Sequence, residues 1–537
     1  DRRPGRYATD DDLERHLVEH DAGNLGLDSR RARCVCEKKE PREKAGNDPE
    51  TGVQVFDFDV LIPAACDCRN GTMRRMTQRK SSLKTELRRL LKEQPDTVSI
   101  ELLVADMHGF LKGKRIQAED MDKVCSKGFS MCAGVVLLDG LGYTIPGFPF
   151  GEADGDPDKE CRLVPGSIAP VPWSERPLAQ AMFRYYEDDG SPFFADPRAV
   201  LEKALEPLYR KRLKVVMATE LEFYLLDAEA DTPTPGVPRV PAIGVPQPGT
   251  QVYSHDDLWE VEAFLNDVYD WCEAQRIPAE SAISEYAQGQ FEVNLRHVDD
   301  PVLACDHAVL LKRIIKAAAR KHGFVASFMA KPFAEESGCG LHVHMSLVNE
   351  NGVNYFSQGK EKMASPPFSA RLRHTVGGLL KAMPESTAIF APNANSYRRL
   401  RPESFAPVEP NWGVNHRAVA VRVPMSDEKN LRFEHRVAGA DANPYLVTAA
   451  IAAAVHHGLT SKCDPGRMVE EGEVVSLKTR IPVRWDAALD KFSRSKVLPA
   501  YLGKDYCRFF LGNRRAESAA FHNTISPLDY EWYLRSV

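Results

Sequence analysis

Acidic side chains alternate with apolar residues in two segments of the chain. Glu220 and Glu222 lie two residues apart in the segment 215–226, which is predicted to be a strand, so both side chains face the same way. Glu292 lies in a second predicted strand, and Glu285 precedes a glycine turn that can return its side chain to the same site. Like charges side by side are unfavourable unless a positive group lies between them. These carboxylates therefore predict a divalent-cation site.

Two further predicted strands carry polar side chains at every second position: His342, His344 and Ser346 in the first, and Arg432, Glu434 and Arg436 in the second. The candidate metal ligands of the four segments are five carboxylates and one imidazole: Glu220, Glu222, Glu285, Glu292, His342 and Glu434. Oxygen ligands with a single histidine suit Mg²⁺ or Mn²⁺ better than Zn²⁺. Taken singly, each pattern also fits a solvated strand face, a hydrogen-bonded core histidine or surface ion pairs. Their common alternation favours one shared site.

Basic residues gather in the C-terminal part of the same region: Arg399, Arg417, Arg422, Lys429, Arg432 and Arg436. Guanidinium groups bind phosphate and carboxylate oxygens through paired hydrogen bonds. A chain with a net charge of −6 that collects arginines beside carboxylates indicates a phosphoryl-transfer site. The alternative, a solvated basic face, fits poorly with the apolar spacers in 418–421.

Strands and helices that position these groups are predicted from residue 81 to the C-terminus. The first elements, predicted to form a small sheet domain over residues 76–190, are a helix over 83–92 and strands over 98–104 and 180–186. Pro197 begins a helix that runs to residue 208. The segment 191–537 is predicted to be the catalytic domain, and its Pro-rich stretch 232–248 a surface loop.

Residues 1–75 differ in composition, with charge clusters and little apolar periodicity. We predict a disordered extension or a mis-assigned start. The pairs Cys34/Cys36 and Cys66/Cys68 are spaced more tightly than zinc ligands usually are, and no nearby histidine completes a ligand set.

The overall composition excludes several classes of function. The 537 residues are 43% hydrophobic and 27% charged, with a pI near 6.3, so the chain has no general attraction to nucleic acid or anionic membranes. The longest apolar stretch, 445–455, is too short for a membrane span and is predicted to be a buried helix. Twelve dispersed cysteines and the lack of a hydrophobic signal segment predict a reduced, cytoplasmic protein.

From about residue 95 onward the chain resembles the glutamine synthetase superfamily. The matching motifs are Glu-x-Glu-Phe-Tyr-Leu at 220–225, Glu-Tyr…Gly-Gln-x-Glu at 285–292, Gly-x-Gly-x-His-x-His at 338–344, Asn-Ser-Tyr-x-Arg at 395–399, Arg-x-Glu-x-Arg at 432–436 and Ala-Asn-Pro-Tyr-Leu at 442–446. The resemblance implies an α+β fold, with a small N-terminal β-grasp domain and an α/β catalytic domain on a curved antiparallel sheet. It also implies a large homo-oligomer of two stacked rings, with active sites at subunit interfaces.

The resemblance implies roles for individual residues. The metal ligands fall into two sets, Glu222, Glu285 and Glu292 for one ion and Glu220, His342 and Glu434 for another. The implied substrate and catalytic positions are Gly338 and Arg399 for the glutamate backbone groups, Arg436 for its activated side chain, Arg417 and Arg422 for the phosphates, and His344, Ser346, Lys429 and Arg432 on the nucleotide side. The implied cofactors are ATP and two or three Mg²⁺ or Mn²⁺ ions. The implied reaction couples glutamate to an amine through γ-glutamyl phosphate.

One loop departs from the pattern of true glutamine synthetases. The segment 400–407 has Phe405 where those enzymes have a glutamate that helps to deprotonate ammonium, and the Phe-Asp-Gly-Ser-Ser motif of their ammonium pocket is replaced at 151–158. Both changes make the chain similar to γ-glutamylpolyamine and γ-glutamylputrescine synthetases, so an organic amine is the expected acceptor.

A cationic amine would suit an acidic entrance formed by Glu152, Asp154, Asp156 and Asp158, with Phe405 and Trp412 against its methylene groups. A solvated loop is the alternative interpretation of that acidic run. Two other functions stay open: an ordinary glutamine synthetase in which Glu403 replaces the missing glutamate, and a non-catalytic assembly that keeps only the fold.

Overall fold

The computed structural model describes residues 82–145, 148–150, 154–228, 251–357, 368–402, 404–476 and 478–537. All of them belong to a compact unit that spans 76–537. The predictions for residues 1–75, the surface loop at 232–248, Glu152 and Glu403 fall outside the described residues.

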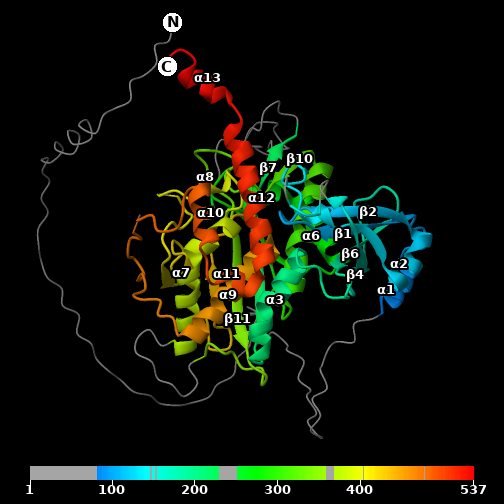
Figure 1. Cartoon of the computed structure of the whole chain (residues 1–537), viewed down its shortest axis with the longest axis horizontal. Coiled ribbons are helices and arrows are strands. Elements are labelled where there is room, and N and C mark those ends of the chain that lie inside the picture. Colours follow the sequence, from blue (N-terminus) through cyan, green and yellow to red (C-terminus); the bar gives the residue numbers. More distant parts are fainter. Residues whose placement is uncertain are drawn as a thin grey trace, which may run out of the picture. The chain divides into compact units, whose positions relative to one another are not determined.

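A six-stranded sheet forms the first part of this unit, in the order β2-β1-β6-β4-β3 with β5 paired to β6. Its strands are β1 (Ser99–Ala105), β2 (Leu111–Gln117), β3 (Phe129–Cys132), β4 (Asp158–Leu163), β5 (Ala169–Pro170) and β6 (Leu178–Tyr186). Helices α1 (Leu83–Glu93) and α2 (Met121–Lys127) accompany this sheet (Figure 1). The helix predicted at 83–92 and the strands predicted at 98–104 and 180–186 are thereby confirmed.

An eight-stranded sheet forms the second part, in the order β12-β13-β14-β11-β7-β9-β8 with β10 paired to β7. Its strands are β7 (Lys214–Asp227), β8 (Ala279–Ser284), β9 (Gln290–Leu295), β10 (Phe324–Ser327), β11 (Leu341–Val348), β12 (Trp412–Val414), β13 (Val421–Val423) and β14 (Phe433–His435). All pairs are antiparallel except β12 with β13. The four segments predicted to carry the chemistry are therefore the neighbouring strands β14, β11, β7 and β9.

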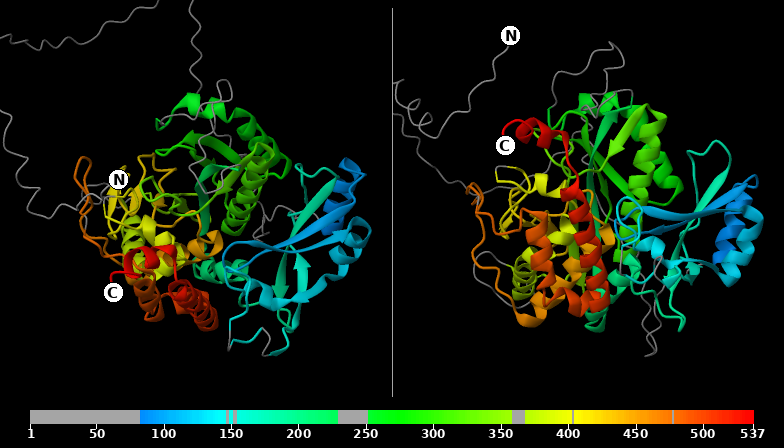
Figure 2. Two further views of the ribbon diagram at one scale, coloured as in Figure 1. Left: turned by 90° about the horizontal axis from the view of Figure 1, so that it is seen from above. Right: turned by 45° about the horizontal axis from the view of Figure 1, so that its top comes forward.

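Helices accompany this sheet (Figure 2). They are α3 (Pro197–Arg210), α4 (His255–Glu260), α5 (Glu262–Ala274), α6 (Pro301–Lys321), α7 (Ala370–Phe390), α8 (Ser396–Arg399), α9 (Pro444–Ser461), α10 (Trp485–Ser493), α11 (Leu498–Leu502), α12 (Lys504–Asn523) and α13 (Pro527–Tyr533). The helix predicted to begin at Pro197 is α3, capped by the Asp196 side chain. The apolar stretch 445–455 is buried in α9, as predicted, and packs against α7 and α3.

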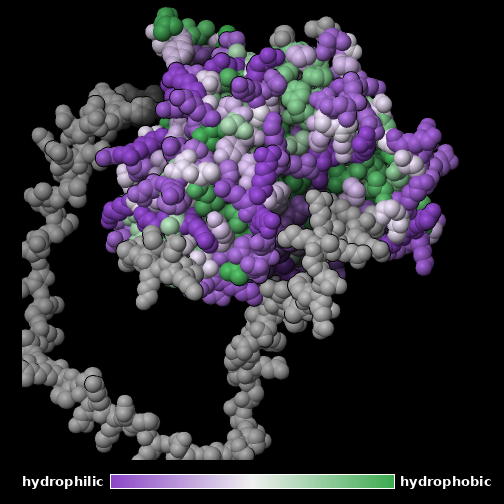
Figure 3. Space-filling model, turned by 60° about the horizontal axis from the view of Figure 1, so that its bottom comes forward, coloured by the Kyte–Doolittle hydropathy of each residue, from purple (hydrophilic) through white to green (hydrophobic). Residues whose placement is uncertain are grey.

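Among the described residues, no helix combines the length and the apolar character that a membrane crossing requires. Figure 3 shows a face on which hydrophilic residues predominate and hydrophobic residues form separate patches. The apolar residues instead form a large internal core that involves both sheets and most of the helices.

Buried polar contacts join the two sheet regions. Asn443 caps α9 with its side-chain oxygen, and its amide nitrogen donates to the carbonyl of Asp106 at 2.9 Å. Gln180 of β6 donates to Gln275 at 3.0 Å. Both contacts are buried, where a lost hydrogen-bond partner costs about 1–3 kcal/mol, so they hold the small sheet against the helices of the larger part.

We predict that Gly378→Ala in α7 lowers the free energy of unfolding by about 1–3 kcal/mol. An added Cβ would lie 2.3 Å from the carbonyl oxygen of Ala454 and 2.5 Å from the Cα of Gly458, both in α9. Without this clash, alanine would stabilise a helix by about 1 kcal/mol relative to glycine. A lower free energy of unfolding, measured with urea, would therefore report the close contact between α7 and α9. Lys381→Ala, at an exposed position of the same helix, is the control. Equal stability of Gly378→Ala and the parent chain would contradict this close packing.

Candidate active site

The register of the larger sheet brings the predicted metal ligands opposite one another. Glu220 of β7 pairs with His342 of β11, and Glu222 pairs with Glu292 of β9. On the far side of β11, His344 pairs with Glu434 of β14. Because side chains on paired residues of adjacent strands lie side by side, strands distant in sequence converge on one surface.

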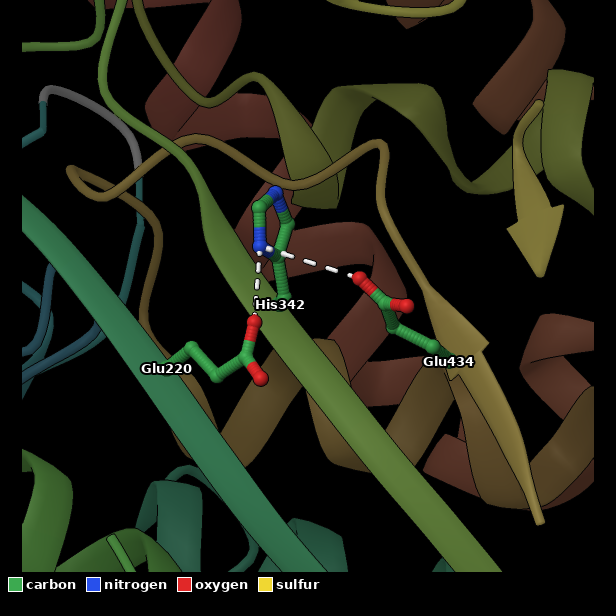
Figure 4. Close-up of side chains that lie close together, drawn as sticks. All are labelled: Glu220, His342 and Glu434. Atoms are coloured by element: carbon green, nitrogen blue, oxygen red, sulfur yellow. Dashed lines mark hydrogen bonds and ion pairs between the residues drawn. The ribbon is translucent and has the colours of Figure 1, made fainter. Parts of the chain in front are cut away.

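One group of candidate ligands consists of Glu220, His342 and Glu434, whose side chains point toward one another in Figure 4. His342 Nδ1 lies 3.1 Å from Glu220 Oε2 and 3.9 Å from Glu434 Oε1. One ligand atom from each residue lies within 4.8 Å of the others. Two carboxylate oxygens and one imidazole nitrogen at this spacing fit a divalent cation.

A second group consists of Glu222, Glu292 and His342, again with ligand atoms within 4.8 Å of one another. His342 Nε2 lies 3.6 Å from Glu222 Oε1, and His342 Nδ1 lies 3.9 Å from Glu292 Oε2. The backbone N–H of Gly340 donates to Glu222 Oε2 at 2.7 Å and orients that carboxylate. His342 therefore lies between two clusters of carboxylates.

Glu285 was predicted to belong to the set of Glu222 and Glu292, and the structure places it beside that set without including it in either compact group. Burial and the charge of Glu222 raise the pKa of Glu285 to about 7. The charge of Glu285 in turn contributes to the raised pKa of Glu292. Glu285 is thus close enough to act electrostatically, although its carboxylate oxygens are farther from the others.

The carboxylates of the site differ in their electrostatic environment. Burial, followed by the charges of the other four glutamates, raises the pKa of Glu292 well above its usual range. Burial opposes ionisation of Glu434 too, but Arg436 and the two histidines lower its pKa to about 2. Burial also disfavours the charged form of Glu220, yet His344 and His342 hold its pKa well below its usual range. The donor set as a whole is an excess of buried negative charge that divalent cations would offset.

Arginines surround the carboxylates. Arg422 donates to Glu434 Oε2 at 2.9 Å, and Arg436 forms an ion pair with the other oxygen of the same carboxylate. Arg399, at the end of α8, is buried and donates to the carbonyl of Val437 at 2.8 Å. An added Cβ on Gly338 would lie 2.9 Å from Arg399 Cγ, so the absence of a side chain there lets the loop approach this arginine.

The predicted nucleotide-side residues are only partly brought together. His344 Nε2 lies 2.7 Å from Glu220 Oε1, and Arg432 donates to His344 Nδ1 at 3.3 Å. Arg417 is exposed, and its charge is near enough to Glu285 to lower that pKa. Ser346, farther along β11, pairs with Val216 through the backbone, and Lys429 is exposed in the loop before β14.

A cavity of about 590 Å³ opens beside the metal-ligand groups. Its lining includes residues that were predicted for the site and several that were not: Glu222, Gly338, His342, Arg399, Phe405, Arg436, and in addition Lys331, Glu335, Glu336, Ser337, Arg401 and Ser404. Phe405 is 65% exposed and packs on Tyr286, with ring centroids 4.6 Å apart. Tyr286 belongs to the Glu-Tyr motif at 285–286, so its position in sequence was a signal that could have found it.

One prediction about the amine side, the position of Trp412, is corrected. Trp412 is only 1% exposed, donates through its indole N–H to Gly466 at 3.4 Å and lies under Arg373, so its ring does not line the cavity. Its place in β12 explains this burial. Asp154 accepts from the N–H of Phe150, Asp156 accepts from Cys132, and Asp158 begins β4. These aspartates belong to the small-sheet region and do not line the cavity of the same chain, so an acidic entrance formed between subunits stays a prediction.

Comparisons with known proteins agree with this geometry. Residues 194–533 match the family model described as glutamine synthetase, catalytic domain. The chain is 37% identical to γ-glutamylputrescine synthetase PuuA of Escherichia coli (strain K12), covering 86% of this chain and 96% of that protein. It is 30% identical to a glutamine synthetase of Pyrococcus horikoshii, covering 78% of this chain and 88% of that protein.

A solved structure described as "Apo GmaS without ligand" matches with a TM-score of 0.70 and 25% identity, covering 83% of this chain and 98% of that one. The predicted α+β fold class is confirmed by this likeness.

In protein kept free of divalent cations by a chelator, we predict that Glu285→Gln is more stable than the parent chain at pH 8 and equal to it at pH 4. The pKa of Glu285 is raised from 4.5 to about 7 by burial and by Glu222, so the parent loses stability as pH rises through this window. Glutamine lacks this loss, which we expect to reach about 2–3 kcal/mol. Urea unfolding at both pH values measures it. A stability difference that does not change with pH would contradict the prediction.

Proposed function

The chain belongs to the glutamine synthetase family, and on that premise we propose that it is an ATP-dependent ligase that joins the γ-carboxylate of glutamate to an organic amine. The observation that carries the proposal is a convergent set of five candidate metal-ligand side chains, with Glu285 beside them, next to a cavity whose loop has the phenyl ring of Phe405.

The reaction requires activation of glutamate, because a free carboxylate is a poor acyl donor. The γ-carboxylate attacks the γ-phosphorus of ATP, and ADP leaves with the electron pair of the broken P–O bond. The neutral amine nitrogen then attacks the acyl carbon of γ-glutamyl phosphate, and inorganic phosphate leaves with the electron pair of the broken C–O bond. The nitrogen gives up one proton to solvent as the amide forms. Water must be kept out of the site while the acyl phosphate exists.

The residues that would hold divalent cations are Glu220, His342 and Glu434 for one ion, and Glu222, Glu292 and the adjacent Glu285 for another. Bound Mg²⁺ or Mn²⁺ supplies positive charge that stabilises phosphate oxygens during transfer. The mixture of buried carboxylates and one shared histidine supports these hard cations over zinc, which prefers more nitrogen and sulfur ligands.

The basic residues divide between the two substrates in this proposal. Arg399 and Arg436 line the cavity beside Glu222 and would bind the carboxylate groups of glutamate. Arg422 of β13, Arg432 just before β14 and His344 of β11 would bind the nucleotide phosphates. The exposed Arg417 is free to reach a phosphate because its guanidinium has no ion-pair partner among the described residues.

An organic amine is supported over ammonium by the character of the cavity. The exposed pair Tyr286 and Phe405 offers apolar surface suited to methylene groups, whereas a phenyl ring cannot accept a proton from ammonium. The relative with 37% identity is named for putrescine, and the one with 30% identity is named a glutamine synthetase. A non-catalytic assembly is the least supported function, because such a protein would not need the complete set of ligands.

We further propose that the chain works as a homo-oligomer in the cytoplasm, with active sites completed by neighbouring subunits. The family supports the assembly. The compartment is supported by the substrates ATP and glutamate and by the cysteines of the described residues, which are all free thiols: Cys125, Cys132, Cys161, Cys272, Cys305, Cys339, Cys463 and Cys507.

A substrate panel tests the proposed reaction. The purified chain is incubated with glutamate, ATP, Mg²⁺ or Mn²⁺ and one of ammonium, methylamine, ethanolamine, butylamine, putrescine or spermidine. We expect phosphate release and a γ-glutamyl amide, detected by mass spectrometry, with at least one organic amine at a kcat/KM above that for ammonium. Ammonium surpassing every organic amine would reject the proposal in favour of glutamine synthetase activity.

We predict that Phe405→Glu shifts the preference toward ammonium by about tenfold in the ratio of kcat/KM values, equivalent to about 1.4 kcal/mol. The new carboxylate would attract ammonium and accept its proton, and it would remove apolar surface from the organic amine. The exposed position tolerates the change without loss of core packing. Phe405→Leu keeps an apolar side chain and serves as the control. An unchanged ratio in Phe405→Glu would show that this loop does not contact the acceptor.

A further inference from the structure

The cavity beside the metal ligands has a buried end and an exposed end. Glu222, His342 and Arg399 are buried and form the end next to the metal-ligand groups. Glu335 and Glu336 are exposed and, with Phe405, form the opposite end. A molecule whose reacting nitrogen reaches the buried end therefore places its other end near these two carboxylates.

The loop that carries the two glutamates is held through its backbone. Lys331 donates through Nζ to the carbonyl of Glu336, and Arg401 donates to the carbonyl of Ala334 at 2.9 Å. Gln290 of β9 donates to the carbonyl of Gly338 at 3.1 Å. Two cations and a buried amide thus fix the path of residues 334–338 without using the carboxylates of the loop.

The carboxylates themselves are left available. Across the ranges that the structure describes, neither Glu335 nor Glu336 forms an ion pair or a side-chain hydrogen bond. Glu222, the third carboxylate of the cavity, is in contrast engaged by Gly340 and His342. The exposed end therefore carries two carboxylates without an ion pair, whereas the nearby cations Lys331 and Arg401 donate to backbone carbonyls of the loop.

Apolar surface accompanies this negative end. Tyr286 is 55% exposed and packs against Phe405, with an angle of 33° between the ring planes. Aromatic faces attract cations and bury methylene groups at the same time. The combination of a hydrophobic wall and two unpaired carboxylates matches a ligand with an alkyl chain and a positive terminus.

We infer that Glu335 and Glu336 are specificity-determining residues that bind the second ammonium group of a diamine or polyamine acceptor. This inference rests on the proposed amine ligation and deepens it. The attacking nitrogen lies at the buried end, the methylene chain runs past Tyr286 and Phe405, and the distal ammonium binds the carboxylates. A monoamine of equal length lacks that last interaction, so the carboxylates affect only acceptors with a second charge.

The test compares putrescine with butylamine, which has the same four-carbon chain and no second ammonium, in the full-length enzyme. We expect the double variant Glu335→Gln, Glu336→Gln to raise the KM for putrescine about tenfold, as for the loss of about 1.4 kcal/mol of binding. The KM for butylamine should change less than twofold. Glu262→Gln, Glu273→Gln removes two exposed charges from α5, outside the cavity, and should leave both KM values unchanged. Thermal unfolding verifies that every variant is folded.

The outcomes separate this inference from the proposed function. The inference is supported if the glutamine variant of Glu335 and Glu336 loses the preference for putrescine over butylamine and the α5 control variant keeps it. Equal changes for both amines, or no change, overturn it while amine ligation by the parent enzyme stands. A parent enzyme that forms no γ-glutamyl amide with any organic amine refutes the proposed function and the inference with it. The double variant Glu335→Lys, Glu336→Lys reverses the two charges. If it folds, it should raise the KM for putrescine further than the glutamine variant does and leave the KM for butylamine unchanged. A folded charge-reversal variant without this effect would contradict the inference.

Discussion

Electrostatic repulsion among buried carboxylates is the constraint on which this structure depends. Glu220, Glu222, Glu292 and Glu434 lie on three strands of one sheet around His342, where like charges in a medium of low polarity strongly oppose one another. The raised pKa of Glu292 expresses that repulsion. Such a face is costly in isolation, so its existence indicates that positive charge joins it in the working protein.

Two kinds of positive charge share this task. Arg422 and Arg436 carry permanent charges and both form ion pairs with Glu434. The charge of Arg436, together with those of His344 and His342, lowers the pKa of this buried carboxyl. Among the described residues, Glu220, Glu222 and Glu292 form no ion pair with an arginine, and divalent cations fit their spacing. The arginines of the protein thus offset part of the negative charge of the carboxylates, and divalent cations that also bind phosphate would offset the rest. This division links the stability of the site to the phosphoryl-transfer chemistry that we propose.

The cavity connects the metal-ligand groups with the proposed binding site of the amine. Its buried end is built by strands β7 and β11, whose positions are set by many backbone hydrogen bonds, together with Arg399 of α8, whereas its exposed end is built by the loops that carry Glu336 and Phe405. Strands hold ligands at the precision that catalysis needs. Loops can change residue type with little effect on the core. In the proposed function, the sheet therefore supplies the metal and phosphate chemistry, and the loops select the amine.

The sequence by itself determined the ligand types, because alternation along a strand reveals which side chains share a face, as for Glu220 and Glu222. Local periodicity also indicated three helices, α1, α3 and α9, and the strands that carry the candidate ligands. Only the tertiary structure decided which strands are neighbours, since pairing such as that of Glu220 with His342 joins residues far apart in the chain. For the same reason Trp412 was placed wrongly and Glu336 was missed: burial and cavity lining depend on packing between distant segments, which local pattern does not record.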